Sequence, residues 1–95
     1  MKYLVTINKE TMQPSIKDLE TGKVYTNNLK LEPYHRADGL HLQLNYKKSE
    51  LYEEVEGKGI VQIPKEENGK FKTSFETNLA KSNKTSSMLT SNLFA

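Results

Sequence analysis

The sequence predicts a small, mostly β protein in which five or six short antiparallel strands form a sheet or a small barrel, with one short helix and a C-terminal tail. Two observations lead to this fold class. Three glycine-centred turn signals divide the first 80 residues, and the segments around them alternate apolar and polar residues with the period of two that is typical of strands. With 95 residues, the chain is long enough for a single domain with one small core.

The turn signals are ETGK at residues 20–23, ADGL at 37–40 and ENGK at 67–70. In each, glycine supplies the positive φ that tight β connections require. Asp-Gly and Asn-Gly also favour the turn type whose twist matches that of the flanking strands. We therefore expect three hairpins.

We expect strands near residues 3–9, 15–26 with a bend or break at Gly22, 29–34, 40–47, 59–64 and 70–77. The alternation is clearest in the fourth segment, which has one apolar face and one polar face. The apolar face holds Leu40, Leu42, Leu44 and Tyr46, and the polar face holds His41, Gln43, Asn45 and Lys47. The apolar face predicts core, and the polar face predicts an outer surface that is available for binding.

One helix is expected near residues 49–56. Ser49 can cap it, Leu51 and Val55 lie four residues apart on one face, and Gly57 can end it. A helix of two turns is unstable alone in water, so its apolar stripe must pack on the sheet. A strand at residues 51–55 is the alternative.

The composition changes at Lys81. Eight of the last fifteen residues are Ser, Thr or Asn, a mixture that cannot offset the entropy lost on ordering. We expect a β-rich domain at residues 1–80 and a tail at 81–95. The tail carries four apolar residues, Met88, Leu89, Leu93 and Phe94. It either folds back on its own domain or frays, or it docks on a protein partner.

Composition argues against several functions. Hydrophobic residues make up 35% and charged residues 27% of the chain, with no apolar run long enough to span a membrane, so a soluble globular protein is expected. The absence of cysteine excludes disulfides, thiolate zinc sites and a cysteine nucleophile, and it fits a reducing compartment. The first residues lack the apolar run of a signal peptide, so we expect a cytoplasmic location.

Catalytic signatures for serine nucleophiles, zinc proteases and phosphate-binding loops are also missing, so no enzyme activity and no cofactor are predicted. The best metal candidate is the spacing His35, Asp38 and His41 around a turn. A fourth ligand is not identifiable, and surface histidines near a turn explain the pattern as well. We predict no metal.

The net charge of +2 is unevenly distributed. Residues 1–48 hold eight Lys and Arg against five Asp and Glu, whereas residues 49–80 hold four against seven. In the basic part, aromatic and cationic residues alternate in a way that suits single-stranded nucleic acid, because rings stack on bases and cations follow the phosphates. The candidates are Lys23, Tyr25, Lys30, Tyr34, Arg36, His41, Lys47 and Lys48.

The order of elements over residues 3–77, with the helix between the third and fourth major strands, resembles that of the OB-like barrels. The resemblance is one of arrangement only and involves no sequence motif. It implies nucleic acid binding on the second and third strands.

We therefore expect a non-enzymatic binding protein. The first hypothesis is an inhibitor or adaptor of viral or mobile-element type that acts through protein–protein contacts, using a strand edge or the apolar tail residues. The alternative is an OB-like module for single-stranded nucleic acid. Open strand edges also make a homodimer plausible.

Overall fold

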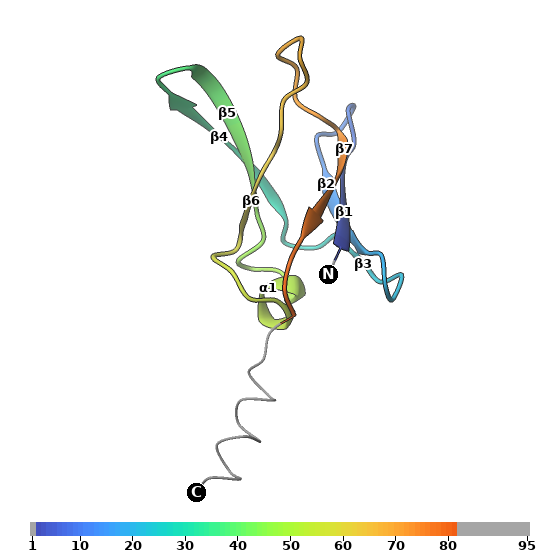
Figure 1. The fold of residues 1–95 in the computed structure, drawn as a ribbon. Helices are drawn as coiled ribbons and strands as arrows, with labels where there is room; N and C mark the ends of the chain where they lie inside the picture. Colours follow the sequence, from blue (N-terminus) through green and yellow to red (C-terminus); the bar gives the residue numbers. More distant parts are fainter. Residues whose placement is uncertain (1, 82–95) are drawn as a thin grey trace, which may run out of the picture.

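The computed structural model describes residues 2–81, and it confirms a mostly β fold with one short helix (Figure 1). The strands are β1 (Lys2–Ile7), β2 (Pro14–Asp18), β3 (Val24–Tyr25), β4 (Lys30–Arg36), β5 (Gly39–Asn45), β6 (Ile60–Gln62) and β7 (Ser74–Asn78), and the helix is α1 (Glu50–Glu54). The predicted tail lies outside the described residues, apart from Lys81.

The strands form two antiparallel sheets. The four-stranded sheet has the order β3-β2-β1-β7, and the three-stranded sheet has the order β4-β5-β6. The two sheets are not closed into a barrel, so the expected OB-like closure is absent. The reason is the choice of partners near the chain end: β6 pairs with β5, whereas β7 pairs with β1.

The three glycine turns are confirmed. Gly22, Gly39 and Gly69 all have positive φ, at 81°, 118° and 84°. The expected break at Gly22 turns residues 15–26 into the β2–β3 hairpin. A further hairpin, between β1 and β2, carries no glycine. There Met12 takes the positive φ, at 61°, and the Asn8 side chain accepts hydrogen bonds from the backbone of Glu10 and Thr11, which stabilise the turn.

Helix α1 forms where it was expected but is shorter. The Ser49 side chain accepts from the Leu51 N–H at 3.2 Å, which caps the first turn. Val55 is already extended and forms a β-bridge with Lys81, so the helix ends before it. Among residues 2–81 no helix is long and apolar enough to cross a bilayer.

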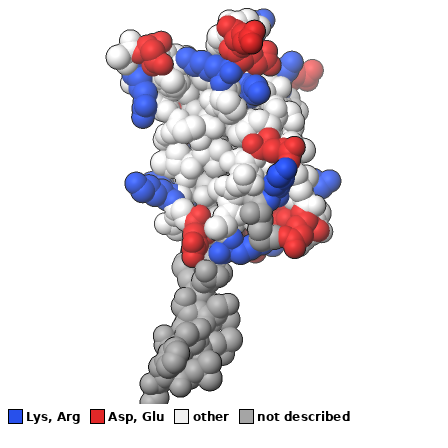
Figure 2. Space-filling view, viewed as in Figure 1, with Lys and Arg blue, Asp and Glu red and all other residues white. Residues whose placement is uncertain are grey.

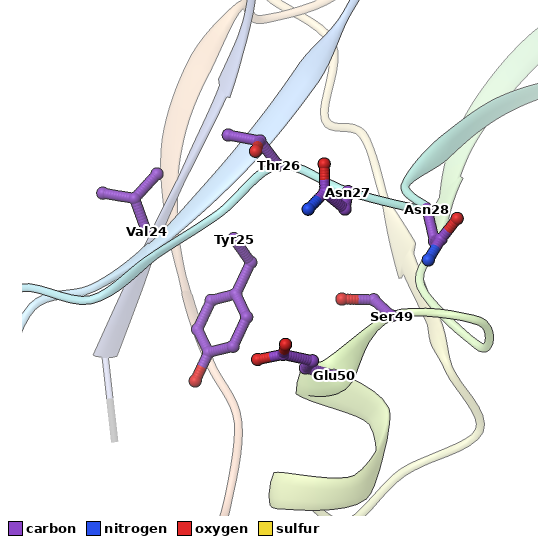
Figure 3. Close-up of a pocket in the computed structure, with 7 residues that line it drawn as sticks. All are labelled: Val24, Tyr25, Thr26, Asn27, Asn28, Ser49 and Glu50. Carbon is purple, nitrogen blue, oxygen red and sulfur yellow. The ribbon is translucent and has the colours of Figure 1, made fainter.

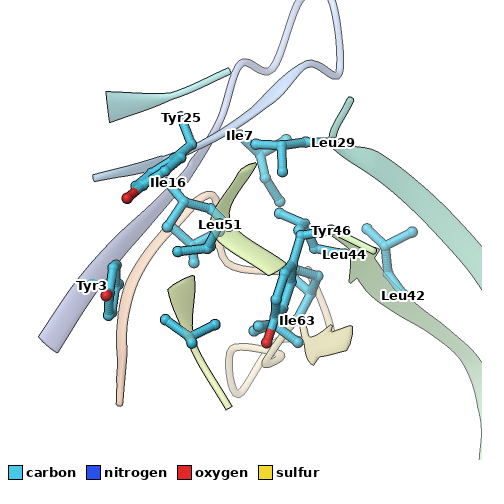
Figure 4. Packing of buried hydrophobic residues seen from close by; sticks show 13 residues of the cluster. Tyr3, Ile7, Ile16, Tyr25, Leu29, Leu42, Leu44, Tyr46, Leu51 and Ile63 are labelled. Carbon is cyan, nitrogen blue, oxygen red and sulfur yellow. The ribbon is translucent and has the colours of Figure 1, made fainter. Parts of the chain in front are cut away.

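Both sheets and α1 share one hydrophobic core (Figure 4). Val5 and Ile16 come from the four-stranded sheet and Leu44 from the three-stranded sheet, and Leu51 of α1 lies between the two groups. The predicted apolar face of residues 40–46 is buried at its last three positions. The first, Leu40, is 43% exposed because the β4–β5 hairpin extends past the core (Figure 1).

A buried carboxylate ties the β2–β3 turn to the end of the described chain. Asp18 is 1% exposed; its Oδ1 accepts from the Glu20 N–H at 2.8 Å, and its Oδ2 lies 2.8 Å from the Lys81 Nζ. The hydrogen bond from Lys81 lowers the pKa of Asp18 to about 2. The Lys81 ammonium also lies 5.4 Å from the centre of the Tyr3 ring.

Truncation of the core should destabilise the protein strongly. Leu44 is fully buried, and Leu44→Ala should lower the free energy of unfolding by about 2–5 kcal/mol. Leu40→Ala on the same strand and the same face is the matched control, and because Leu40 is half exposed it should cost about 0.5 kcal/mol or less. Chemical denaturation measures both, and equal losses would contradict the position of the core.

The Asp18 ion pair should make stability depend on pH. The folded pKa of about 2 lies below the ordinary value of 3.8, so the stabilisation is present above about pH 4 and is lost as the pH falls toward 2. Asp18→Asn should therefore lower the Tm at neutral pH, with a difference that shrinks under acid. Glu10→Gln, in the exposed β1–β2 turn, is the control. A Tm difference that does not change with pH would count against the pair.

Candidate binding face on the three-stranded sheet

The outer side of the three-stranded sheet is the candidate site, and we call it the polar face. Cross-strand pairs set its rows: Lys30 opposite Asn45, Glu32 opposite Gln43, and Tyr34 opposite His41. Between them, Leu31, Leu42 and Leu44 alternate toward the core. The polar face comprises Lys30, Glu32, Tyr34, Arg36, His41, Gln43, Asn45 and Gln62.

The end of the polar face near the β4–β5 turn is aromatic. The rings of Tyr34 and His41 stack with their centroids 5.5 Å apart and an interplanar angle of 26°. The Tyr34 hydroxyl donates to the Gln62 side chain, and the Arg36 guanidinium lies 5.6 Å from the Tyr34 ring. The His41 Nε2 lies 2.7 Å from Asp38 Oδ1, and this contact lowers the pKa of Asp38. The ring pair is therefore held in place by Gln62 of β6, Asp38 of the β4–β5 turn and Arg36 of β4.

The middle of the polar face holds a carboxylate. The Glu32 Oε1 accepts from Gln43 Nε2 at 3.1 Å and from Asn45 Nδ2 at 3.3 Å. These bonds from Gln43 and Asn45 lower the pKa of Glu32, and the charges of Lys30 and Lys47 act in the same direction. Glu32 is therefore ionised at neutral pH and held in one orientation.

The other end of the polar face is cationic. A pocket of about 180 Å³ opens there, lined by Asn28, Lys30, Glu32, Asn45, Lys47 and Lys48. The Lys47 N–H donates to Asn45 Oδ1 at 2.9 Å, which fixes the chain as it leaves β5. Three lysines and one glutamate thus line the same pocket.

Six of the eight residues predicted to bind nucleic acid lie on this face or line its pocket. They are Lys30, Tyr34, Arg36, His41, Lys47 and Lys48. Glu32 and Gln62 were not among the predicted site residues, and Gln43 and Asn45 were predicted on a polar face without a role. Because alternate residues of a strand lie on the same side, the sequence was sufficient to predict that Glu32 lies on the same side of the sheet as Tyr34.

The other two predicted residues, Lys23 and Tyr25, lie at the edge of the four-stranded sheet. The Lys23 Nζ lies 3.2 Å from both Glu50 and Glu54, and these bonds raise the pKa of Lys23. Tyr25 is 5% exposed, and its hydroxyl donates to Glu54. Because the Tyr25 ring is buried, it is not available to stack on a base. The bonds that Lys23 and Tyr25 make to Glu54 join the β2–β3 hairpin to α1.

A second pocket of about 180 Å³ lies between the β3–β4 connection and α1 (Figure 3). Its lining includes Tyr25, Asn28, Ser49 and Glu50. Ser49 caps the helix and Glu50 pairs with Lys23, so these polar groups already have structural partners. We assign this pocket no binding role.

The remaining predicted sites have simple outcomes. His35 and His41 lie on opposite sides of the three-stranded sheet, so the His35, Asp38 and His41 set does not converge. Across residues 2–81 no cluster of three potential ligands could hold a metal ion. The predicted partner-binding residues Met88, Leu89, Leu93 and Phe94 lie outside the described residues.

The charged side chains are not spread evenly over the surface. In the view of Figure 2, an uncharged area lies at the centre of the described domain, and Lys, Arg, Asp and Glu lie above it, below it and on its right. Cations and anions are mixed at both ends. On this side of the molecule, charge alone therefore marks no binding site.

Comparisons with family models, with curated proteins and with solved structures find no match to this chain.

Proposed function

We propose that this protein is a non-enzymatic module that binds single-stranded nucleic acid on the polar face. The observation that carries the proposal is the convergence of Tyr34, His41 and Arg36 at one end of the face with three lysines at the other. Tyr34 and Lys30 are four residues apart on β4, which corresponds to about 13 Å along a strand. A short stretch of nucleic acid can therefore contact both ends.

The chemistry of the two ends is complementary to a single strand. Aromatic rings stack on bases of any sequence, and each such contact contributes about 1–3 kcal/mol. Ammonium and guanidinium groups neutralise phosphates and release their counterions. The stack of Tyr34 on His41 is already ordered by Gln62 and Asp38, so little side-chain entropy is lost on binding.

The charge of the face sets the expected salt dependence. Arg36 and the three pocket lysines are partly balanced by Glu32 and Asp38. If two to four phosphates are neutralised, the slope of log K against log salt concentration should be about −1.4 to −2.8. Binding should therefore be measurable mainly at low ionic strength.

A second candidate is the protein-directed inhibitor or adaptor, and β7 favours it. This strand pairs with β1 on one side, and among residues 2–81 no strand pairs with its other side. The Ile7 N–H donates to the Thr73 carbonyl at 2.7 Å, so by alternation the backbone groups of Ser74, Glu76 and Asn78 point away from β1. An extended segment of a partner could add there.

Removal of the half-buried Tyr34 ring should weaken binding of a fluorescent single-stranded oligonucleotide. Tyr34→Ala should raise the Kd about 5- to 150-fold at low salt, because one stacking contact is lost. Tyr34→Phe is the matched control: it keeps the ring, loses only the hydroxyl, and should retain most of the affinity. Fluorescence anisotropy over a range of salt concentrations measures both variants.

Charge controls complete this experiment. Lys30→Ala should reduce the salt slope by about 0.7, whereas Lys17→Ala, on the outer side of the four-stranded sheet, should leave it unchanged. The proposal is wrong if the wild-type protein binds no single strand at low salt, or if Tyr34→Ala binds as tightly as the wild type.

The edge of β7 is tested by a proline. Glu76→Pro removes an N–H that points away from β1, so the β1–β7 ladder should persist while strand addition is blocked. Capture of a host protein by the immobilised chain, with nuclease present, should be lost in Glu76→Pro and kept in Glu76→Ala. Equal capture by the two variants, both shown to be folded by circular dichroism, would exclude this edge.

A further inference from the structure

Glu32 is out of place on a surface that only binds phosphate. It lies among Lys30, Lys47 and Lys48 at the pocket, where its negative charge repels the nucleic acid backbone. A carboxylate at such a position needs another role. Carboxylates on nucleic-acid-binding surfaces accept hydrogen bonds from the amino groups of bases.

We propose that Glu32 is the base-specificity-determining residue of the polar face and that it selects cytosine or adenine, which carry an exocyclic amino group, over thymine and uracil, which carry a carbonyl there. This inference rests on the proposed function and names the part of the ligand that the pocket reads. A base seated beside Glu32 would neighbour the base on Tyr34, because the two residues are two positions apart on one side of β4, or about 7 Å.

The carboxylate is built to accept one further bond. An ionised carboxylate has about four acceptor positions. Oε1 already accepts from Gln43 and Asn45, and Oε2 accepts from Asn45 at 3.4 Å, which leaves one position on Oε2. One position suits a single amino group. It does not suit the two adjacent donors of guanine, which a carboxylate recognises with both oxygens.

The lysines beside Glu32 supply the complementary donor. In cytosine and adenine the amino group lies next to a ring nitrogen that accepts a hydrogen bond. Lys30 and Lys47 line the same pocket as Glu32, so an ammonium group is available for that nitrogen. In thymine and uracil a carbonyl oxygen would face Oε2 instead, and two acceptors repel each other.

The orientation of Glu32 does not depend on the ligand. Its two amide partners, Gln43 and Asn45, are two residues apart on β5 and lie on the same side of the sheet. The hydrogen-bonded pairing of β4 with β5 fixes their positions opposite Glu32 and Lys30. A preorganised acceptor discriminates between bases better than a mobile one, because a wrong base cannot be accommodated by rotating it away.

The experiment compares oligo-dC with oligo-dT of equal length, at low salt and slightly basic pH, by fluorescence anisotropy. The wild-type protein should bind oligo-dC roughly 5- to 10-fold more tightly, the lower part of the range for one base contact. In Glu32→Gln the preference should fall below about 2-fold, because an amide can donate to the thymine carbonyl. Affinity for oligo-dT should stay the same or rise, because a negative charge is removed.

Glu76→Gln is the matched control. It makes the same charge change on the outer side of the four-stranded sheet, so the preference should persist. If Glu32→Gln fails to fold, Gln43→Met, which removes one donor to the carboxylate, should also reduce the preference.

The outcomes separate the two proposals. Equal, measurable binding of oligo-dC and oligo-dT by the wild type overturns the role of Glu32 and leaves the proposed function standing. A preference for oligo-dC that persists in Glu32→Gln also overturns the role of Glu32 and leaves the proposed function standing. Failure of the wild type to bind either oligonucleotide overturns the proposed function and this inference together.

Discussion

The burial of Leu42 and Leu44 fixes the register of β5, and the polar face depends on that register. With these two side chains in the core, strand alternation leaves His41, Gln43 and Asn45 on the outside. A slip of one residue would exchange the two sets and bury the polar one. The same hydrophobic contacts that stabilise the domain therefore also determine which side chains stand beside Glu32 and Tyr34.

Ion pairs explain why the opposite charges of the two halves of the chain do not produce two separate charged surfaces. Lys23 of the basic half lies between Glu50 and Glu54 of the acidic half, and Asp18 holds Lys81. These contacts connect the β2–β3 turn to α1 and to Lys81. The cations at the polar face, Lys30, Arg36, Lys47 and Lys48, take no part in these ion pairs and give the face a modest positive charge.

Local features of the fold could be predicted from the sequence, and non-local ones could not. The turns at Gly22, Gly39 and Gly69 follow from the conformational freedom of one residue type, and the alternation in residues 40–46 separates the core from the outer face. Which strand pairs with β6 and which with β7 depends on contacts far apart in sequence. The expectation of a barrel failed at that step. The β1–β2 turn was missed because Met12 rather than a glycine adopts the positive φ there, at 61°.

The candidate site shows the same division. Alternation along β4 and β5 was sufficient to place Tyr34, Arg36 and His41 on one side of the sheet. It could not show that Tyr25 would be buried against Glu54, because that contact joins β3 to a helix 29 residues away in the chain. The role of Glu32 also depends on cross-strand neighbours, Gln43 and Asn45, whose register is set by the hairpin as a whole.

Pro33 in the middle of β4 affects how the molecule behaves at high concentration. The Leu42 carbonyl accepts from the Ile63 N–H at 3.0 Å, so the backbone of Leu42 faces β6, and the nitrogen of Pro33 opposite it faces away from β5. Among residues 2–81 no strand pairs with the other edge of β4, and Pro33 interrupts this edge at its centre because it has no N–H to donate. Addition of strands from other copies of the protein at this edge is disfavoured, so β4, the longest edge strand within residues 2–81, is a poor template for aggregation.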